Sequence, residues 1–150
     1  NFKFMLKKIL QITKPIRYFF DKLTYDKSNY PHNLSKLKGS LKNKPLLIVG
    51  NGPSLNKTPL DKFMHINSIG MNKIDLIFKK TSWRPNFILA TNSLVIKQHA
   101  VNLSKLNIPC YLSWKSRYFV PKPLRKYFSF FLTSGSSKFT LSIKTLIILR

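Results

Sequence analysis

The segment Leu46-Leu47-Ile48-Val49-Gly50-Asn51-Gly52-Pro53-Ser54-Leu55 gives the clearest structural signal in this 150-residue chain. Four consecutive apolar residues that end at a glycine are typical of a short strand buried on both faces of a sheet. A glycine-rich turn after such a strand either connects it tightly to a helix or lets the backbone approach a phosphate-bearing ligand. The spacing alone leaves both interpretations open.

Alternating apolar runs and helix-compatible segments follow this strand. The runs predict further strands at about 66–70, 87–90, 110–112 and 128–132. The helix-compatible segments lie at 59–64, 73–80 and 93–106. Strands that alternate with helices form a parallel sheet through right-handed crossovers. We therefore predict an α/β, Rossmann-like fold over residues 45–150, with a mostly parallel sheet and flanking helices.

The residues at the two ends of the sequence indicate that the chain is a fragment of a longer protein. The chain begins with Asn1 rather than Met, and it stops inside a further apolar run at 145–150. Because a domain seldom ends at a strand of the buried type, we expect a sheet that is incomplete at its carboxyl end.

The charge of the chain is strongly basic. Lys and Arg total 27 against 4 acidic residues, all of them aspartate, which gives a formal charge of +23. Without glutamate, a paired-glutamate glycosidase is excluded, and a carboxylate-rich two-metal site is disfavoured. The excess charge favours an anionic partner, which is a nucleic acid, a phosphate-bearing ligand or an acidic membrane.

Cysteine content and hydropathy bear on the compartment. The single cysteine, Cys110, excludes an internal disulfide and a cysteine-based zinc site, and it fits a reducing compartment. No apolar stretch approaches the roughly 20 residues of a membrane span. We expect a cytoplasmic protein that associates peripherally with the inner face of the membrane.

Residues 1–30 predict a basic, amphipathic helical arm, and residues 31–44 a connector rich in Lys, Ser and Asn. Apolar residues recur at spacings of three and four, at Phe2, Met5, Leu6, Ile9, Ile12, Ile16, Phe19, Phe20 and Leu23. Pro15 is expected to interrupt the helix. Such an arm either lies on an anionic lipid surface or packs on the domain behind it.

Neither common nucleotide fingerprint fits the turn after the first strand. A dinucleotide-binding turn needs a third glycine where this chain has Leu55, and a P-loop needs glycine where it has Asn56.

Three segments, taken in order, nevertheless carry a resemblance. They are LLIVGNGPSLNKTPLDKF (46–63), SIGMNKIDLIF (68–78) and WRPNFILATN (83–92). Together they resemble the 6-hydroxymethylpterin diphosphokinase MptE-like family over about residues 38–140. Bacterial members of that family accompany flagellin glycosylation and surface polysaccharide loci. The GNGPSL turn also resembles that of bacterial sialyltransferases that use CMP-sialic acid.

The resemblance implies a nucleotide-binding site. It assigns nucleotide contacts to Asn51, Gly52 and Ser54, and it matches Asn72 and Asn92 to asparagines that follow the next two strands. The residues themselves agree, because the carboxyl ends of successive parallel strands meet at one crevice and carboxamides both donate and accept hydrogen bonds.

The implied activity is transfer of a nucleotide-activated sugar, of the sialic or pseudaminic acid type, to a surface glycan or flagellin. One alternative is a 6-hydroxymethylpterin diphosphokinase, which would need ATP and Mg²⁺. Another is a non-enzymatic basic module that binds a membrane or nucleic acid. In both families the catalytic groups follow the region that corresponds to this chain, so we assign no catalytic residue, metal or cofactor and expect the fragment to be inactive.

The remaining candidates have simpler interpretations. His32, His65 and His99 are expected to be surface or packing residues, and Cys110 a buried thiol. Arg84 either reaches a phosphate or is solvated. The basic, aromatic segment 114–127 predicts a surface loop that could stack bases, but no recognised nucleic-acid-binding module accompanies it, so nucleic acid is not the expected partner.

Overall fold

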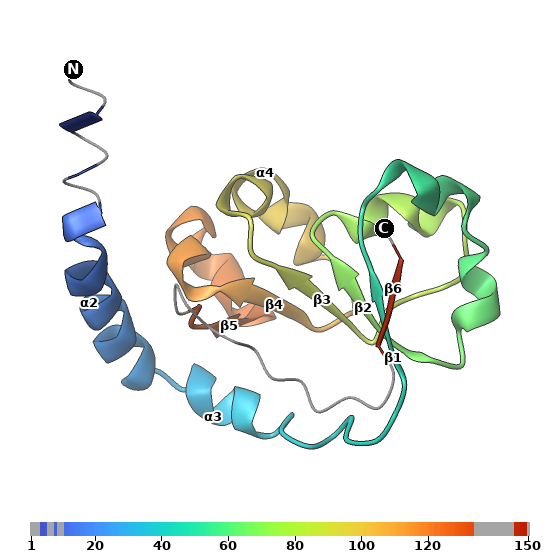
Figure 1. Cartoon of the computed structure of the whole chain (residues 1–150), viewed down its shortest axis with the longest axis horizontal. Helices are drawn as coiled ribbons and strands as arrows, with labels where there is room; N and C mark the ends of the chain where they lie inside the picture. Colours follow the sequence, from blue (N-terminus) through green and yellow to red (C-terminus); the bar gives the residue numbers. More distant parts are fainter. Residues whose placement is uncertain (1–3, 6–7, 9–10, 134–145, 150) are drawn as a thin grey trace.

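The computed structural model describes residues 4–5, 8, 11–133 and 146–149 (Figure 1). Its centre is a six-stranded sheet in the order β5-β4-β3-β2-β1-β6, and every neighbouring pair is parallel. The strands are β1 (Leu46–Val49), β2 (Asn67–Met71), β3 (Phe87–Ala90), β4 (Cys110–Ser113), β5 (Phe128–Phe131) and β6 (Leu146–Leu149). The predicted α/β, Rossmann-like fold is confirmed.

The strand order reverses at β1. Strands β1 to β5 follow one another across the sheet, whereas β6 pairs with the other side of β1, with Leu46 opposite Leu146 and Val49 opposite Leu149. In open α/β sheets a ligand binds outside the carboxyl ends of the strands where the order reverses. The topology therefore directs attention to the residues that follow Val49.

One face of the sheet is fully buried and the other only partly. The register turns the following buried residues to the same face: Leu47, Val49, Ser68, Gly70, Ile88, Ala90, Cys110, Leu112, Phe128 and Phe130. On the opposite face, Leu46 and Ile69 are buried, whereas Ile48, Phe87 and Tyr111 are half-buried. In the described part, the burial on both faces that the apolar runs predict is therefore complete on one face and partial on the other.

Crossover geometry explains this asymmetry. Strands added in one direction by right-handed crossovers place all their connections on the same face of the sheet. The helix α4 (Ser93–Leu103) shows this, because its Ile96, Ala100 and Leu103 join the core cluster on the fully buried face. The only connection that returns past β1 leads from β5 to β6, and residues 134–145 of it lie outside the described part.

The other connections are 3₁₀ helices. They are η1 (Pro53–Lys57), η2 (Leu60–Phe63), η3 (Ile74–Lys79), η4 (Trp114–Phe119) and η5 (Lys122–Tyr127). Prolines at the starts of η1 and η5 and the shortness of all five segments favour this tighter helix. The prediction of a surface loop over residues 114–127 is wrong. It forms η4 and η5, with Trp114 and Arg117 buried against the amino-terminal arm.

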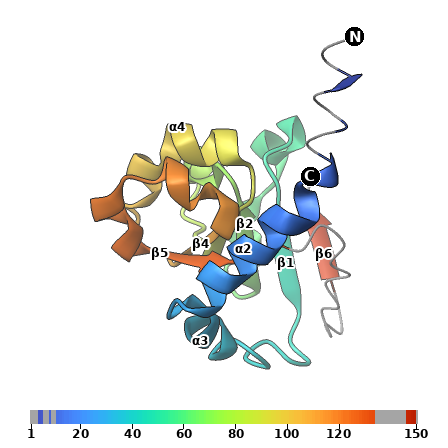
Figure 2. The ribbon, with the colours of Figure 1, turned by 90° about the vertical axis from the view of Figure 1, so that its left-hand side faces the viewer.

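The arm contains α2 (Lys14–Asp26), and the predicted connector contains most of α3 (Tyr30–Ser35). The expected interruption is found just before Pro15, since Gln11 and Ile12 are helical, Thr13 is a turn and α2 begins at Lys14. Pro15 lies in the first turn of α2, where a proline loses no intrahelical hydrogen bond. Helix α3 packs against β5, and the amino-terminal half of α2 stands clear of the domain (Figures 1 and 2). The predicted helical positions Phe2, Leu6 and Ile9 lie outside the described residues. None of the helices in the described ranges has the length and apolar character needed to cross a membrane.

Candidate functional site

A cavity of about 230 Å³ opens beside the carboxyl end of β1. It is lined by Asn51, Gly52, Leu55, Asn56, Lys73, Ile74, Leu76, Ile77 and Lys80. The turn after β1 with η1 forms one wall, and η3 with its flanking lysines forms the other. The cavity thus lies between the segments that follow β1 and β2, next to the strand at which the order reverses.

The lining combines apolar side chains with amide and ammonium groups. Leu55, Ile74 and Ile77 are buried apolar residues. Lys73 donates from Nζ to Gln98 Oε1 at 3.1 Å, and Lys80 donates from Nζ to Asn56 Oδ1 at 2.9 Å. Because an ammonium group carries three donors, each lysine can hold its neighbour and still meet a phosphate oxygen.

Lys73 and Lys80 are functional candidates that the sequence analysis missed. They flank η3, the short helix directly after the second predicted strand. Lys73 stands two residues after the end of the strand, which is a sequence signal, whereas nothing in the sequence distinguishes Lys80 from its neighbour Lys79. In the structure they give the cavity two positive charges, which suit an anionic ligand.

The sharp turn from β2 into η3 depends on two residues. A Cβ on Gly70 would lie 2.5 Å from Ile74 Cγ2, so only glycine lets η3 approach the strand this closely. Asn72 has φ of +53°, a left-handed conformation that asparagine adopts more readily than most other residues. These two positions bring Lys73 and Ile74 to the cavity.

The side chain of Asn72 points into the protein. Its Oδ1 is buried and has no hydrogen-bond partner among the described residues, and the residue does not line the cavity. An unpaired buried carbonyl costs about 1–3 kcal/mol. Rotation toward solvent or a ligand would remove this cost.

The predicted site residues are not all gathered in one place. The structure brings Asn51 and Gly52 into the cavity lining and leaves Ser54, Asn72 and Asn92 outside it. Ser54 is exposed, and its carbonyl oxygen accepts a hydrogen bond from the Thr58 hydroxyl at 3.1 Å.

Asn92 is the N-cap residue of α4. Its Oδ1 accepts hydrogen bonds from the backbone amides of Leu94 at 2.9 Å and Val95 at 3.3 Å. This oxygen therefore stabilises the start of the helix.

The turn after β1 does not present an α-helix terminus. It leads into η1, a 3₁₀ helix of five residues that begins with Pro53, and Gly52 has ordinary extended backbone with φ of −71°. Since so short a helix sums few peptide dipoles, the charge of the site comes from the lysines instead.

His99 and Asp75 form a buried pair between α4 and η3. His99 Nε2 lies 2.8 Å from both carboxylate oxygens of Asp75, and Asn102 Nδ2 lies 3.2 Å from His99 Nδ1. The histidine and aspartate side chains are 7% and 12% exposed. His99 is thus a packing residue. Its partner Asp75 lies 24 residues earlier in the sequence, too far for the sequence to indicate the pair.

Cys110 is a buried thiol, and its Sγ donates to the Ile108 carbonyl at 3.3 Å. Burial first, and then the nearby charge of Asp75, raise the pKa of this thiol to about 12. A thiol of this kind stays protonated at neutral pH and does not act as a nucleophile.

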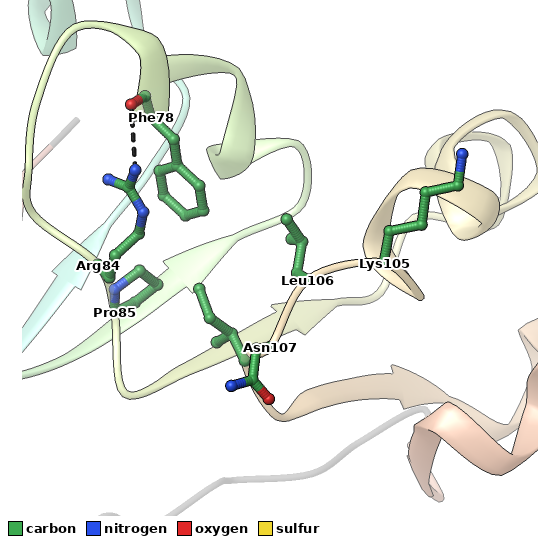
Figure 3. Close-up of a pocket in the computed structure, with 7 residues that line it drawn as sticks. Phe78, Arg84, Pro85, Lys105, Leu106 and Asn107 are labelled. Carbon is green, nitrogen blue, oxygen red and sulfur yellow. Dashed lines mark hydrogen bonds between the residues drawn. The ribbon is translucent and has the colours of Figure 1, made fainter.

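A second cavity, of about 420 Å³, lies at the opposite edge of the sheet, near the amino ends of β3 and β4 (Figure 3). Arg84 borders it, with its guanidinium 4.3 Å from the centroid of the Phe78 ring. Arg84 donates to the carbonyl oxygens of Phe78, Thr81 and Trp83 at 3.2, 2.8 and 2.7 Å. The arginine therefore orders this loop, away from the turn after β1.

Within the described residues, no three His, Cys, Asp or Glu side chains come together as a metal site would require. Comparisons of the chain with known protein families, with curated proteins and with solved structures give no match.

Proposed function

We propose that this chain binds the nucleotide part of a nucleotide-activated sugar in the cavity beside β1, as the nucleotide-binding part of an MptE-like transferase. The observation that carries the proposal is the position of the cavity. It opens at the carboxyl ends of β1 and β2, next to the reversal of strand order at β1, and it is bordered by two lysines.

Each part of the lining has a role in this proposal. Lys73 and Lys80 neutralise the phosphate, and Asn51 offers both a donor and an acceptor to ribose hydroxyls or a pyrimidine edge. The apolar side chains of Leu55 and Ile77 cover the face of the base. Ser54, Asn72 and Asn92 would contribute only to a ligand that extends beyond the cavity along the strand ends.

The cavity is suited to recognition rather than to proton transfer. Among the described residues, the polar side chains of its lining carry amide and ammonium groups, with no carboxylate or imidazole. We therefore assign no catalytic residue. The sugar, of the sialic or pseudaminic acid type, and its transfer to a surface glycan or flagellin are proposed on the sequence resemblance.

A second candidate, pyrophosphoryl transfer from ATP to a pterin alcohol, is favoured by the two lysines, which also suit a triphosphate. The proposed compartment is the cytoplasm, in keeping with the single buried Cys110.

The ligand class is tested by titrating the protein separately with CMP, CDP, ATP and a DNA oligonucleotide at moderate salt, using calorimetry. The proposal predicts saturable binding of CMP and CDP that is weakened in Asn51→Ala. Preference for ATP over CDP would favour the diphosphokinase. Tight, salt-sensitive oligonucleotide binding with no response to mononucleotides would overturn both enzyme proposals.

A further inference from the structure

One side of the arm is apolar and open to solvent. Its exposed residues are Ile12 (67% exposed), Ile16 (57%), Phe19 (58%), Phe20 (61%) and Leu23 (41%). Spacings of three and four place them on one side of a helix, and Thr13, which precedes α2, keeps helical backbone angles. We call these five residues the apolar stripe.

The other side of α2 is fixed to the domain. Arg117 Nη1 donates to Asp21 Oδ1 at 3.1 Å, Trp114 Nε1 donates to Thr24 Oγ1 at 3.4 Å, and Tyr25 is buried. At 3.6 residues per turn, Asp21 and Tyr25 lie roughly opposite the centre of the apolar stripe. These contacts therefore hold the helix with the stripe directed away from the domain. Figure 2 shows the course of α2 in front of the sheet.

The charge around the stripe is positive. Residues 1–27 contain seven Lys and Arg and two Asp, and 7 − 2 gives a net charge of +5. Both aspartates are already paired, Asp26 with Lys22 at 2.6 Å and Asp21 with Arg117. The sequence of the arm therefore combines a net positive charge with five exposed apolar side chains.

This combination of charge and apolar area favours one kind of partner for the apolar stripe. Two copies of the arm would bring like charges together, which disfavours pairing of stripes. Nucleic acid would satisfy the charge but would leave large apolar side chains in water. The surface of an anionic bilayer accepts both, because apolar side chains enter the acyl boundary while Lys and Arg reach the headgroups.

We propose that α2 docks this protein on an anionic lipid bilayer, with the apolar stripe inserted below the headgroups and the helix axis in the plane of the surface. The proposal adds a binding surface to the proposed cytoplasmic location. It does not depend on the cavity beside β1, so either proposal can fail without the other.

Sedimentation with vesicles tests the docking. The full chain is mixed with vesicles of phosphatidylcholine alone or with phosphatidylcholine and phosphatidylglycerol, and the bound fraction is measured. We expect binding to the anionic vesicles, with an affinity about tenfold lower in Phe19→Ala/Phe20→Ala, which removes apolar area and no charge. The matched control is Met64→Ala/Leu94→Ala, which removes two exposed apolar side chains outside the arm and should bind like the wild type. Circular dichroism confirms that each variant is folded.

Three results would overturn the proposal. The first is unchanged vesicle binding in Phe19→Ala/Phe20→Ala, which would show that charge alone attracts the protein. The second is release of the protein from anionic vesicles by an equal charge of oligonucleotide, which would favour nucleic acid. The third is a concentration-dependent dimer that is lost in the double variant, without vesicle binding, which would identify a second copy as the occupant.

Discussion

Arg117 and Asp21, 96 residues apart, join the amino-terminal arm to the sheet domain through a contact of 3.1 Å between Nη1 and Oδ1. The guanidinium lies between two aromatic rings, 4.1 Å from the centroid of Trp114 and 4.0 Å from that of Tyr118. Its Nη1 also donates to the Trp114 carbonyl at 2.8 Å, and only 7% of the residue is exposed. This buried cation is therefore a central contact between the arm and the sheet domain, beside the Trp114–Thr24 hydrogen bond and the buried Tyr25.

Replacement of this cation should destabilise the protein. We expect Arg117→Ala to lower the free energy of unfolding by about 3 kcal/mol, because it removes the stacking and leaves Asp21 without its partner. Urea unfolding measures the loss. The control is Arg125→Ala, whose Nε donates to the Val120 carbonyl, and which should cost much less. Equal losses in the two variants would contradict the assigned role of Arg117.

A methyl group at position 70 should be poorly tolerated. Because a Cβ there would lie 2.5 Å from Cγ2 of the fully buried Ile74, we expect Gly70→Ala to cost about 1–3 kcal/mol in urea unfolding. Ile74→Ala removes the clashing atom at the expense of a cavity. The double variant should therefore lose less than the sum of the two single losses, and strict additivity would show that the clash is not the cause.

Asp61 should make stability depend on acid pH. Its Oδ1 accepts hydrogen bonds from the Thr81 hydroxyl at 2.8 Å and from the Ser82 and Trp83 amides at 2.9 and 3.1 Å. The Thr81 hydroxyl, followed by these amides, holds the pKa of Asp61 below its ordinary value of 3.8. The stabilisation is therefore fully present above that value and is lost as the pH falls through the lowered pKa.

Thermal melting of Asp61→Asn measures this effect. The variant should melt below the wild type at pH 7, and the difference should shrink when both are melted below the pKa of Asp61. The exposed Asp26→Asn serves as the control. A difference that stays constant into strong acid would contradict the assignment.

The thiol of Cys110 should be unreactive in the folded protein. Since burial raises its pKa to about 12, we expect no alkylation by iodoacetamide at pH 8 in the native state and rapid alkylation in urea. Mass spectrometry of the alkylated protein measures both rates. Fast modification of the folded chain would show that β4 opens readily or that the thiol is accessible.

The strands could be predicted from sequence because they are local apolar runs, and their parallel arrangement follows from the helical segments between them. The 3₁₀ form of the connections could not be predicted. Segments of four to six residues have little intrinsic helical preference, so packing decides their form.

The candidate site was predictable only at the turn after β1. Asn51 and Gly52 stand next to a strand end in the sequence, whereas Lys73 and Lys80 reach the cavity because Gly70 lets η3 approach β2. Asn92 has the same sequence position relative to its strand as Asn51, but its side-chain oxygen caps a helix. Residue type at a strand end therefore does not separate a ligand contact from a cap.

The measurement that tests nucleotide binding beside β1 most directly compares the affinity for CDP of the wild type, Lys80→Ala and Lys79→Ala. The two lysines are neighbours of equal charge and both are exposed, but only Lys80 lines the cavity. Loss of a charge-assisted contact to phosphate should weaken binding about tenfold in Lys80→Ala and leave Lys79→Ala within about twofold of the wild type. Equal effects of the two substitutions, or CDP binding that neither changes, would contradict a nucleotide site in this cavity.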